Sequence, residues 1–238
     1  MEEKKYTLGL TDVGRKNKIS NKAIIKMLED VGGIESEKAG YGLNEIDTNH
    51  LSWVLLAWKV KVLRRPIYNE EVIARTWARD GNKVFTYRDY EIYDSNGNLC
   101  VIATSKWTLI DIRTLKLVGI SEEVRSKYTF FNKSVFEEEI EKLKEPKSVI
   151  KENDYKILRS QIDVNRHVHN LYYLDIAYEI LPEDIYYGEE KDNIEITYKK
   201  QIKLNDDIMC KYTIEDGKDI VTIKSKDNKV LHAIVRLY

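Results

Sequence analysis

The chain has 238 residues, of which 42% are hydrophobic and 33% charged, and its formal net charge is -1. This composition is that of a folded protein with a sizeable core, and its balanced charge supplies no global field to attract nucleic acid or a membrane surface. The longest purely apolar run, "WVLLAW", is too short to span a bilayer, and "MEEKKYTLGL" contains no signal-peptide-like segment. We therefore expect a cytoplasmic protein with no nucleic-acid partner and no membrane span.

The first half of the sequence predicts one helix followed by a strand. Apolar residues recur at helical spacing in "NKAIIKMLEDVGG", and the glycine pair at 32–33 is expected to end that helix. Residues 51–66 end in alternation, so Trp58, Val60 and Val62 should face one way and the lysines between them the other.

The following region predicts an antiparallel sheet. Residues 71–111 contain three long strand-like segments, separated by "RDGNK" and "DSNGN". Both of those sequences are typical of hairpin turns. The chain has only three prolines, which suits long uninterrupted strands.

A linker is predicted between the two halves. In "VFEEEIEKLKEP", Phe136, Ile140 and Leu143 would share one face of an otherwise charged surface helix that leads to Pro146. The predicted division is an N-terminal unit over 1–130, a linker with this short helix over 131–148, and a C-terminal unit over 149–238.

The second half repeats the pattern of the first. Both halves have a polar loop opening on "DV", at Asp12 and at Asp163, and then a helix, the second within "NLYYLDIAYEILP". The strands that follow end in matching turns, "NEEV" and "NDDI", and pairing them sets Arg64 against Lys200. We expect an α+β protein made of two units, each with one helix packed on an antiparallel sheet.

The stretch "DVNRHVHN" before the second helix is the strongest candidate for a reactive site. Asp163, Asn165 and His167 alternate, so an extended loop would point all three into one cavity. The helix start would add backbone N–H groups for a developing oxyanion, and an acid, an amide and an imidazole beside them could form a hydrolytic centre. The simpler alternative is that Asp163 and Asn165 cap the helix and His167 only packs.

Other chemistries fit the sequence less well. His167, His169 and Asp163 could ligate zinc, but the other two histidines, His50 and His232, form no second cluster. No G-x-S-x-G segment supports a serine nucleophile. The cysteines Cys100 and Cys210 are far apart in strand-like, apolar settings, which indicates packing positions rather than a disulfide or a metal site. We expect no metal and no cofactor.

Two further groups of residues are candidates for substrate binding. The basic group comprises Arg64, Arg65, Lys199, Lys200 and Lys203, and the aromatic group comprises Trp53, Trp58 and Trp77. Such residues ordinarily form solvated strand edges and core. Their functional alternatives are a docking patch for an acidic partner and the wall of a long apolar pocket.

The stretch "DVNRHVHNLYYLDIAYEILP" resembles the motif of the acyl-acyl carrier protein thioesterases, the plant-type Fat family and its bacterial relatives. That motif reads D-x-N-x-H-V-N-N-x-x-Y, followed by a helix that carries a Glu and ends near a Pro. The matching residues are Asp163, Asn165, His167, Val168, Asn170, Tyr173, Glu179 and Pro182. The first half is similar at "DVGRKNKIS", and the resemblance extends over essentially the whole chain.

The resemblance implies a double hotdog fold, two units that each wrap a curved antiparallel sheet around a long helix. It implies hydrolysis of fatty acyl-acyl carrier protein, with the acyl tunnel in the N-terminal unit and the catalytic groups in the C-terminal unit. Two positions depart from the family pattern: His169 stands where Asn is usual, and Gln201 stands where a downstream catalytic Glu is usual. A Gln cannot act as a base, although it can orient water or a carbonyl. Base chemistry would then fall to Asp163, through water or through His167.

Two alternatives to this function remain open at the level of sequence. An acyl-CoA thioesterase of the same fold would use the same basic residues, since CoA is also anionic. A non-catalytic acyl-binding protein would explain Gln201. Either a monomer or a homodimer is compatible with a tandem unit, and the acyl chain length is not encoded in any motif.

Overall fold

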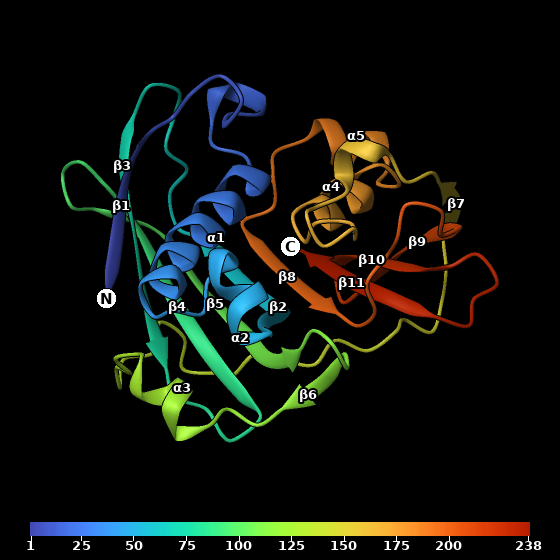
Figure 1. Ribbon diagram of the computed structural model, residues 1–238. Coiled ribbons are helices and arrows are strands. Elements are labelled where there is room, and N and C mark those ends of the chain that lie inside the picture. The colour runs from blue at the N-terminus through green and yellow to red at the C-terminus, as the bar shows by residue number, and fades with distance from the viewer. The chain divides into compact units, whose positions relative to one another are not determined.

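The computed structural model describes residues 1–238, which divide into two compact units, Met1–Ile140 and Glu141–Tyr238. Figure 1 shows the elements of both units. The elements of the first unit are β1 Glu2–Thr7, η1 Arg15–Asn17, α1 Asn21–Lys38, η2 Leu43–Glu45, α2 Ile46–Asn49, β2 Leu51–Val62, β3 Glu71–Arg79, β4 Phe85–Asp94, β5 Leu99–Asp111, β6 Lys116–Val118 and α3 Glu122–Ser126. Its strands pair antiparallel in the order β1-β3-β4-β5-β2, and β6 pairs with β5. The predicted strands over 51–66 and 71–111 are confirmed.

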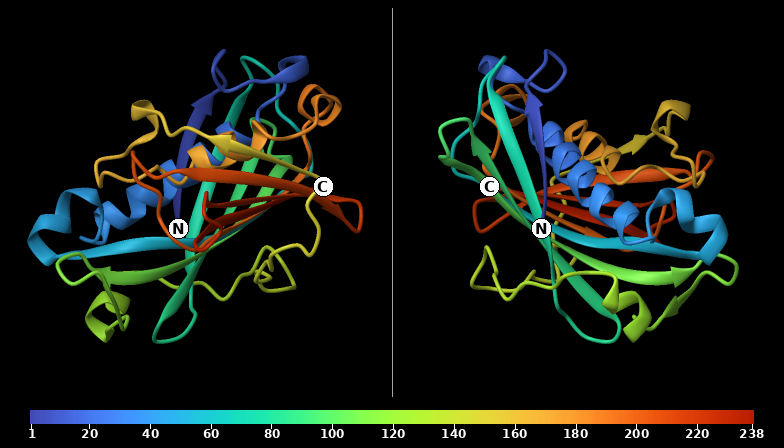
Figure 2. Two further views of the ribbon diagram at one scale, coloured as in Figure 1. Left: turned by 90° about the vertical axis from the view of Figure 1, so that its right-hand side faces the viewer. Right: turned by 60° about the vertical axis from the view of Figure 1, so that its left-hand side comes forward.

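The core of the first unit lies between α1 and one face of this sheet, as Figure 2 shows. The predicted alternation in β2 is confirmed: Trp58, Val60 and Val62 are 0%, 1% and 5% exposed. The Trp58 ring packs on Tyr90 of β4, with centroids 5.1 Å apart. Strand alternation thus buries one row of side chains under the helix.

Helix α1 does not end at the glycine pair, contrary to prediction, but continues to Lys38. A β-carbon on Gly32 would lie 3.2 Å from both the Arg88 side chain and the Tyr90 hydroxyl. Beyond the glycines, Glu35 forms an ion pair with the buried Arg88. The glycine therefore allows the helix to approach the sheet closely, and tertiary contacts outweigh its low helix propensity.

The second unit has the same plan with a shorter helix. Its elements are β7 Lys151–Tyr155, η3 Arg159–Gln161, α4 Tyr172–Tyr178, α5 Glu183–Tyr187, β8 Asn193–Tyr198, β9 Ile208–Glu215, β10 Lys218–Ser225 and β11 Leu231–Leu237. The strands pair antiparallel in the order β8-β11-β10-β9-β7. The predicted helix in "NLYYLDIAYEILP" is confirmed, and it buries Leu174 and Ile176 fully against β10 and β11. No helix in the chain is both long and apolar enough to cross a bilayer.

The helix predicted around Phe136, Ile140 and Leu143 is wrong, because residues 136–146 contain no helix. The segment is extended enough for three alternate residues to reach the sheet of the second unit. Leu143 is 5% exposed and packs with Ile220 and Ile234, while the residues on either side make ion pairs. These pairs are Glu141 with Arg236 and Glu145 with Lys224. Contacts at period two favour an extended strap over the helix that local propensity predicts.

Both cysteines are buried and free, in agreement with the predicted packing role. Cys100 lies on β5, where its sulfur accepts a hydrogen bond from the Arg64 guanidinium at 3.3 Å. Cys210 lies on β9 under α4, and its thiol faces the Ile176 carbonyl at 3.9 Å. Burial raises the pKa of the Cys210 thiol to about 12, so this residue stays a neutral core side chain.

Candidate active site

Asp163 and His167 lie at the two ends of one tight turn between η3 and α4. The Asp163 N–H donates to the His167 carbonyl at 2.8 Å, and the Arg166 N–H donates to the Asp163 carbonyl at 3.0 Å. Arg166 adopts a left-handed conformation, with φ of 63°, to close the turn. Ile162 and Val168 flank it as an antiparallel bridge. The structure therefore corrects the expectation of an extended loop: the segment folds back on itself.

The Asp163 carboxylate is held by the backbone of this turn. Its Oδ1 accepts the Asn165 N–H at 2.8 Å and the His167 N–H at 3.1 Å. The second carboxylate oxygen takes part in neither bond. Asp163 thus caps a turn rather than the helix, because α4 begins only at Tyr172. The carboxylate is therefore fixed through Oδ1, and its second oxygen is left outside these bonds.

The N–H groups at the start of α4 do not form the expected oxyanion site. The Tyr172 and Tyr173 N–H groups donate to the carbonyls of His169 and Asn170, at 2.9 and 3.2 Å. The Leu171 N–H donates to His169 Nδ1 at 3.2 Å. These donors are already satisfied, so an oxyanion would require other groups.

Both histidines of the site are biased toward the neutral form. Burial is the main cause that lowers the pKa of His167, and the negative charge of Asp163 opposes it. Burial likewise lowers the pKa of His169, against the same opposing charge. Because His169 Nδ1 accepts the Leu171 N–H, its neutral ring carries the proton on Nε2. The ring of His169 is therefore hydrogen-bonded to the backbone of the loop, whereas the imidazole of His167 makes no hydrogen bond within the chain.

The segment that carries Gln201 is bonded to this loop. The Val168 N–H donates to the Ile202 carbonyl at 2.8 Å, and the Ile202 N–H donates to the buried Tyr173 hydroxyl at 3.1 Å. On the other side, His232 Nδ1 lies 2.9 Å from the Lys200 carbonyl. The segment that contains Gln201 therefore lies next to the turn of Asp163 and His167.

Four polar side chains around the turn have no hydrogen-bond partner within the chain. They are the amides of Asn165, Asn170 and Gln201 and the imidazole of His167. Gln201 and Asn165 are exposed, and Asn170 and His167 are half-buried. The turn and the segment bonded to it thus carry an acid fixed by backbone donors, uncommitted amides and an imidazole, which are groups that can bind and polarise a carbonyl and activate water.

The same turn occurs in the first unit, which confirms the predicted repeat but changes its register. Val13 and Ile19 form an antiparallel bridge, and the Gly14 N–H donates to the Lys18 carbonyl at 2.8 Å. Gly14 and Lys18 therefore occupy the positions of Asp163 and His167. The predicted match of Asp12 with Asp163 is wrong by two residues.

Side-chain capping explains that shift. The Asp12 carboxylate accepts the Gly9 N–H at 2.9 Å, and Gln161 accepts the Leu158 N–H at 2.8 Å in the same way. The first unit consequently lacks a carboxylate where the second has Asp163. At this turn the first unit has Gly14 and Lys18 in place of the carboxylate and the imidazole of the second.

The predicted match of Arg64 with Lys200 is confirmed by equivalent contacts. The Arg64 N–H donates to the Cys100 carbonyl at 3.1 Å, and the Lys200 N–H donates to the His232 carbonyl at 3.3 Å. The Arg64 guanidinium is bound within its own unit by Glu70 and Asp94. Those contacts support a structural role for Arg64 in place of the predicted contact with substrate.

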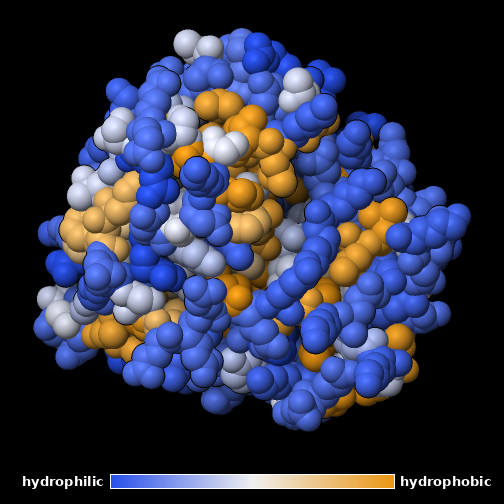
Figure 3. Space-filling view, turned by 90° about the horizontal axis from the view of Figure 1, so that it is seen from below, coloured by the Kyte–Doolittle hydropathy of each residue, from blue (hydrophilic) through white to orange (hydrophobic).

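The remaining predicted binding residues differ in their environments. Lys199 and Lys200 are exposed, and burial together with the charge of Lys142 lowers the pKa of Lys199. Trp58 is fully buried, and its indole N–H has no partner. Trp53 is half-buried and donates to the Tyr128 hydroxyl at 2.9 Å. On the face shown in Figure 3, hydrophilic side chains predominate and hydrophobic ones emerge in patches between them.

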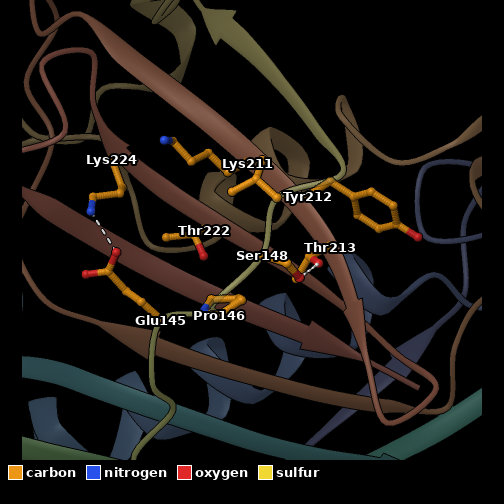
Figure 4. A pocket seen from close by; sticks show the side chains of 9 residues that line it. Glu145, Pro146, Ser148, Lys211, Tyr212, Thr213, Thr222 and Lys224 are labelled. Atoms are coloured by element: carbon orange, nitrogen blue, oxygen red, sulfur yellow. Dashed lines mark hydrogen bonds and ion pairs between the residues drawn. The ribbon is translucent and has the colours of Figure 1, made fainter.

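A pocket on the second unit lies away from these residues. It is lined by residues of β9 and β10, including Lys211 and Lys224, and by Glu145, Pro146, Ser148 and Val149 (Figure 4). Both lysines are paired, with Glu152 at 3.5 Å and with Glu145 at 2.6 Å. No predicted site residue lines this pocket.

Comparison with known proteins gives a consistent result for both units. The model of the acyl-ACP thioesterase N-terminal domain matches residues 1–128, and the model of the acyl-ACP thioesterase C-terminal domain matches residues 144–235. An oleoyl-acyl carrier protein thioesterase of Coriandrum sativum is 26% identical over 231 residues, which is 89% of this chain and 62% of that protein. An oleoyl-acyl carrier protein thioesterase of Arabidopsis thaliana is 26% identical over 86% of this chain and 61% of its own length. The chain thus spans less than two thirds of these relatives.

Solved structures show the same fold. A 12:0-ACP thioesterase from Umbellularia californica has a TM-score of 0.88 at 20% identity, over 99% of this chain and 95% of that one. An acyl-ACP thioesterase from Bacteroides thetaiotaomicron has a TM-score of 0.86 at 17% identity, over 99% and 96%. The predicted α+β fold with two hotdog units is confirmed.

Proposed function

This chain belongs to the acyl-ACP thioesterase family, and on that premise we propose that it hydrolyses fatty acyl-acyl carrier protein. The products would be free fatty acid and the carrier, and chain elongation would end. The observation that carries the proposal is the turn in which backbone N–H groups fix the Asp163 carboxylate beside the uncommitted imidazole of His167.

The proposed reaction uses this turn to activate water. A water molecule held between the free oxygen of Asp163 and the ring of His167 loses a proton to this pair. Its oxygen attacks the thioester carbon, the carbonyl oxygen becomes negative, and collapse of the intermediate breaks the carbon–sulfur bond. The proton then passes to the departing thiolate. Because burial lowers the pKa of His167, the ring is neutral and able to accept a proton at neutral pH.

The amides complete the polar surroundings of the thioester. Asn165 lies next to the Asp163 carboxylate, because the backbone N–H of Asn165 donates to it. Gln201 cannot act as a base, so we assign it to holding a carbonyl or a water. The acyl chain would occupy the first unit, where Trp53 and Trp58 are wall candidates, and catalysis would occur in the second. Both assignments rest on the family resemblance.

Acyl carrier protein is the partner that the proposed function requires. Lys199 and Lys200 are exposed next to Gln201 and suit an acidic partner, with Lys203 close by in sequence. A cytoplasmic location is a further prediction, and a tandem unit is compatible with either a monomer or a homodimer. Fractionation of cells would test the location, and light scattering on the purified protein would measure the oligomeric state.

The function is tested by supplying purified protein with one acyl group on two donors, acyl carrier protein and CoA. We expect multiple turnovers and a kcat/KM at least tenfold higher for the carrier-bound substrate. A preference for CoA would replace this assignment with an acyl-CoA thioesterase. Saturable acyl binding without turnover would identify the chain as a binding protein, the alternative that Gln201 favours.

A further inference from the structure

One pair of equivalent positions, next to the end of a strand and before the helix, has different hydrogen bonding in the two units. In the first unit, Arg65 donates to the Ile19 carbonyl at 3.0 Å and to Oδ1 of Asn21 at 2.9 Å. Asn21 is fully buried. The arginine thus closes the space between the end of its own strand and the start of α1.

The repeat assigns equivalents to both residues in the second unit. The Ile19 N–H donates to the Pro66 carbonyl at 2.8 Å, as the Val168 N–H donates to the Ile202 carbonyl at 2.8 Å. Counting one residue back from Pro66 and from Ile202 pairs Arg65 with Gln201. Counting two residues on from Ile19 and from Val168 pairs Asn21 with Asn170.

The equivalent pair in the second unit is open. The side chains of Asn170 and Gln201 make no hydrogen bond within the chain, although Asn170 is half-buried. The backbone beside each is fixed, because the Asn170 carbonyl accepts the Tyr198 hydroxyl at 3.1 Å and the Lys200 carbonyl contacts His232 at 2.9 Å. Two amides are therefore held at positions where the first unit has a closed contact.

The lengths of the side chains indicate what fits between them. The amide of Gln ends two bonds short of the guanidinium of Arg, a loss in reach of about 2.5 Å. Arg65 reaches Asn21 with a direct hydrogen bond. At the equivalent positions of the second unit, the shorter Gln201 side chain would end about two hydrogen-bond lengths from Asn170. One oxygen atom that accepts a bond from each amide spans that distance. The amide of Asn170 can present its NH₂ group to such an oxygen.

We propose that Asn170 and Gln201 together bind the thioester carbonyl oxygen and stabilise its negative charge in the transition state. This assignment rests on the proposed function and supplies the donors that the start of α4 does not provide. Both groups touch the reacting atoms, so both are catalytic residues. They neither gain nor lose a proton, which leaves the proton transfers to Asp163 and His167.

The test replaces each amide with an acid of the same shape, in Asn170→Asp and Gln201→Glu. An acid accepts hydrogen bonds and repels the oxyanion, so kcat for acyl carrier protein should fall by about 10²–10³ in each case. KM should change less than about threefold, since the interaction strengthens only in the transition state. Asn153→Asp, an equal change at an exposed position on β7, should alter neither parameter by more than about twofold.

A third variant, Gln201→Arg, tests the repeat directly. The new arginine should reproduce the contacts of Arg65, reaching the Val168 carbonyl and the Asn170 side chain. The protein should keep or raise its Tm, while kcat falls by at least about 10²-fold because the oxygen site is filled. A crystal structure of this variant would show the bond to Asn170.

The outcomes separate this assignment from the proposed function. If the wild type turns over but Asn170→Asp and Gln201→Glu keep kcat within about threefold, or if Gln201→Glu raises activity, the amide pair is not the oxyanion site. A fall in kcat/KM that comes entirely from a higher KM, with kcat unchanged, would also overturn the assignment. If the wild type itself does not turn over acyl carrier protein, the proposed function fails instead.

Discussion

Asp163 and His167 hold each other through the backbone: the Asp163 N–H bonds the His167 carbonyl at 2.8 Å, and the His167 N–H bonds the Asp163 carboxylate at 3.1 Å. The side chain of His167 takes no part in either bond. The shape of the turn and its chemistry therefore depend on different atoms. Substitutions can remove the imidazole, or the negative charge of the acid, while the turn survives.

His167→Ala should lower kcat for acyl carrier protein by about 10²–10⁴-fold while Tm stays within a few degrees of wild type. The backbone bonds of the turn do not require the ring. Steady-state kinetics and a thermal melt on the same preparation would measure both quantities. A fall of less than about threefold in kcat would exclude the ring from proton transfer.

The acid side of the pH profile should report the neutral form of His167. Burial lowers its pKa below the ordinary value of about 6.5, so activity should persist below that pH and disappear as the ring takes up a proton. Asp163 opposes this shift, so Asp163→Asn should move the residual acid limb to still lower pH. His169→Asn should leave the limb in place. If it moves the limb instead, His169 is the titrating base.

Reversal of the exposed charges at Lys199 and Lys200 to Glu should raise KM for acyl carrier protein more than KM for a small thioester. The effect should weaken with salt, because the Debye length is about 8 Å at physiological ionic strength. Lys83 and Lys116 are exposed on the first unit, and their reversal supplies a control with the same change in net charge. Equal rises in KM for both substrates would show that these lysines do not dock the carrier protein.

Leu143→Ala should lower the free energy of unfolding by about 2–3 kcal/mol, because the strap buries this side chain against Ile220 and Ile234. Chemical denaturation would measure the loss. Leu158→Ala, at a leucine that is 51% exposed in the same unit, should cost less than about 1 kcal/mol. Equal losses would argue against the strap.

Much of the fold could be predicted from periodicity in the sequence. The alternation of Trp58, Val60 and Val62 and the turns "NEEV" and "NDDI" each have a local physical cause. The strap could not be predicted, because the acidic run around Leu143 favours a helix locally while Glu141 and Glu145 pair with a distant strand. Likewise, Gly32 indicates a helix end until the packing of Arg88 and Tyr90 against α1 is known.

The site was only partly predictable for the same reason. The motif identified Asp163, Asn165 and His167, but their alternation suggested an extended loop, whereas Arg166 closes a turn. Asn170 was matched to the motif without a role. Its significance appears only when Asn21 and Arg65 show what the same position does in the first unit. The shared letters "DV" in the two halves predict a match of Asp12 with Asp163, which is two residues away from the match that the backbone hydrogen bonds show.

Val164, the residue after Asp163, distinguishes the observed turn from an extended loop. An extended loop would direct this side chain into the protein, where its loss would reduce stability. In the turn it is 75% exposed. Val164→Ala should therefore change both Tm and kcat very little, and thermal melting with steady-state kinetics would detect any larger effect. A loss of more than about 1 kcal/mol would favour the extended loop.

The central claim is that the Asp163 carboxylate takes part in hydrolysis, and Asp163→Asn tests it most directly. An Asn side chain retains an oxygen for the N–H groups of Asn165 and His167, so the turn should persist. The measurement is release of free fatty acid from acyl carrier protein under multiple-turnover conditions at the optimum pH, with circular dichroism to verify the fold. We predict a fall in kcat of about 10²–10⁴-fold in a folded protein. A folded Asp163→Asn variant with kcat near that of the wild type would contradict the account.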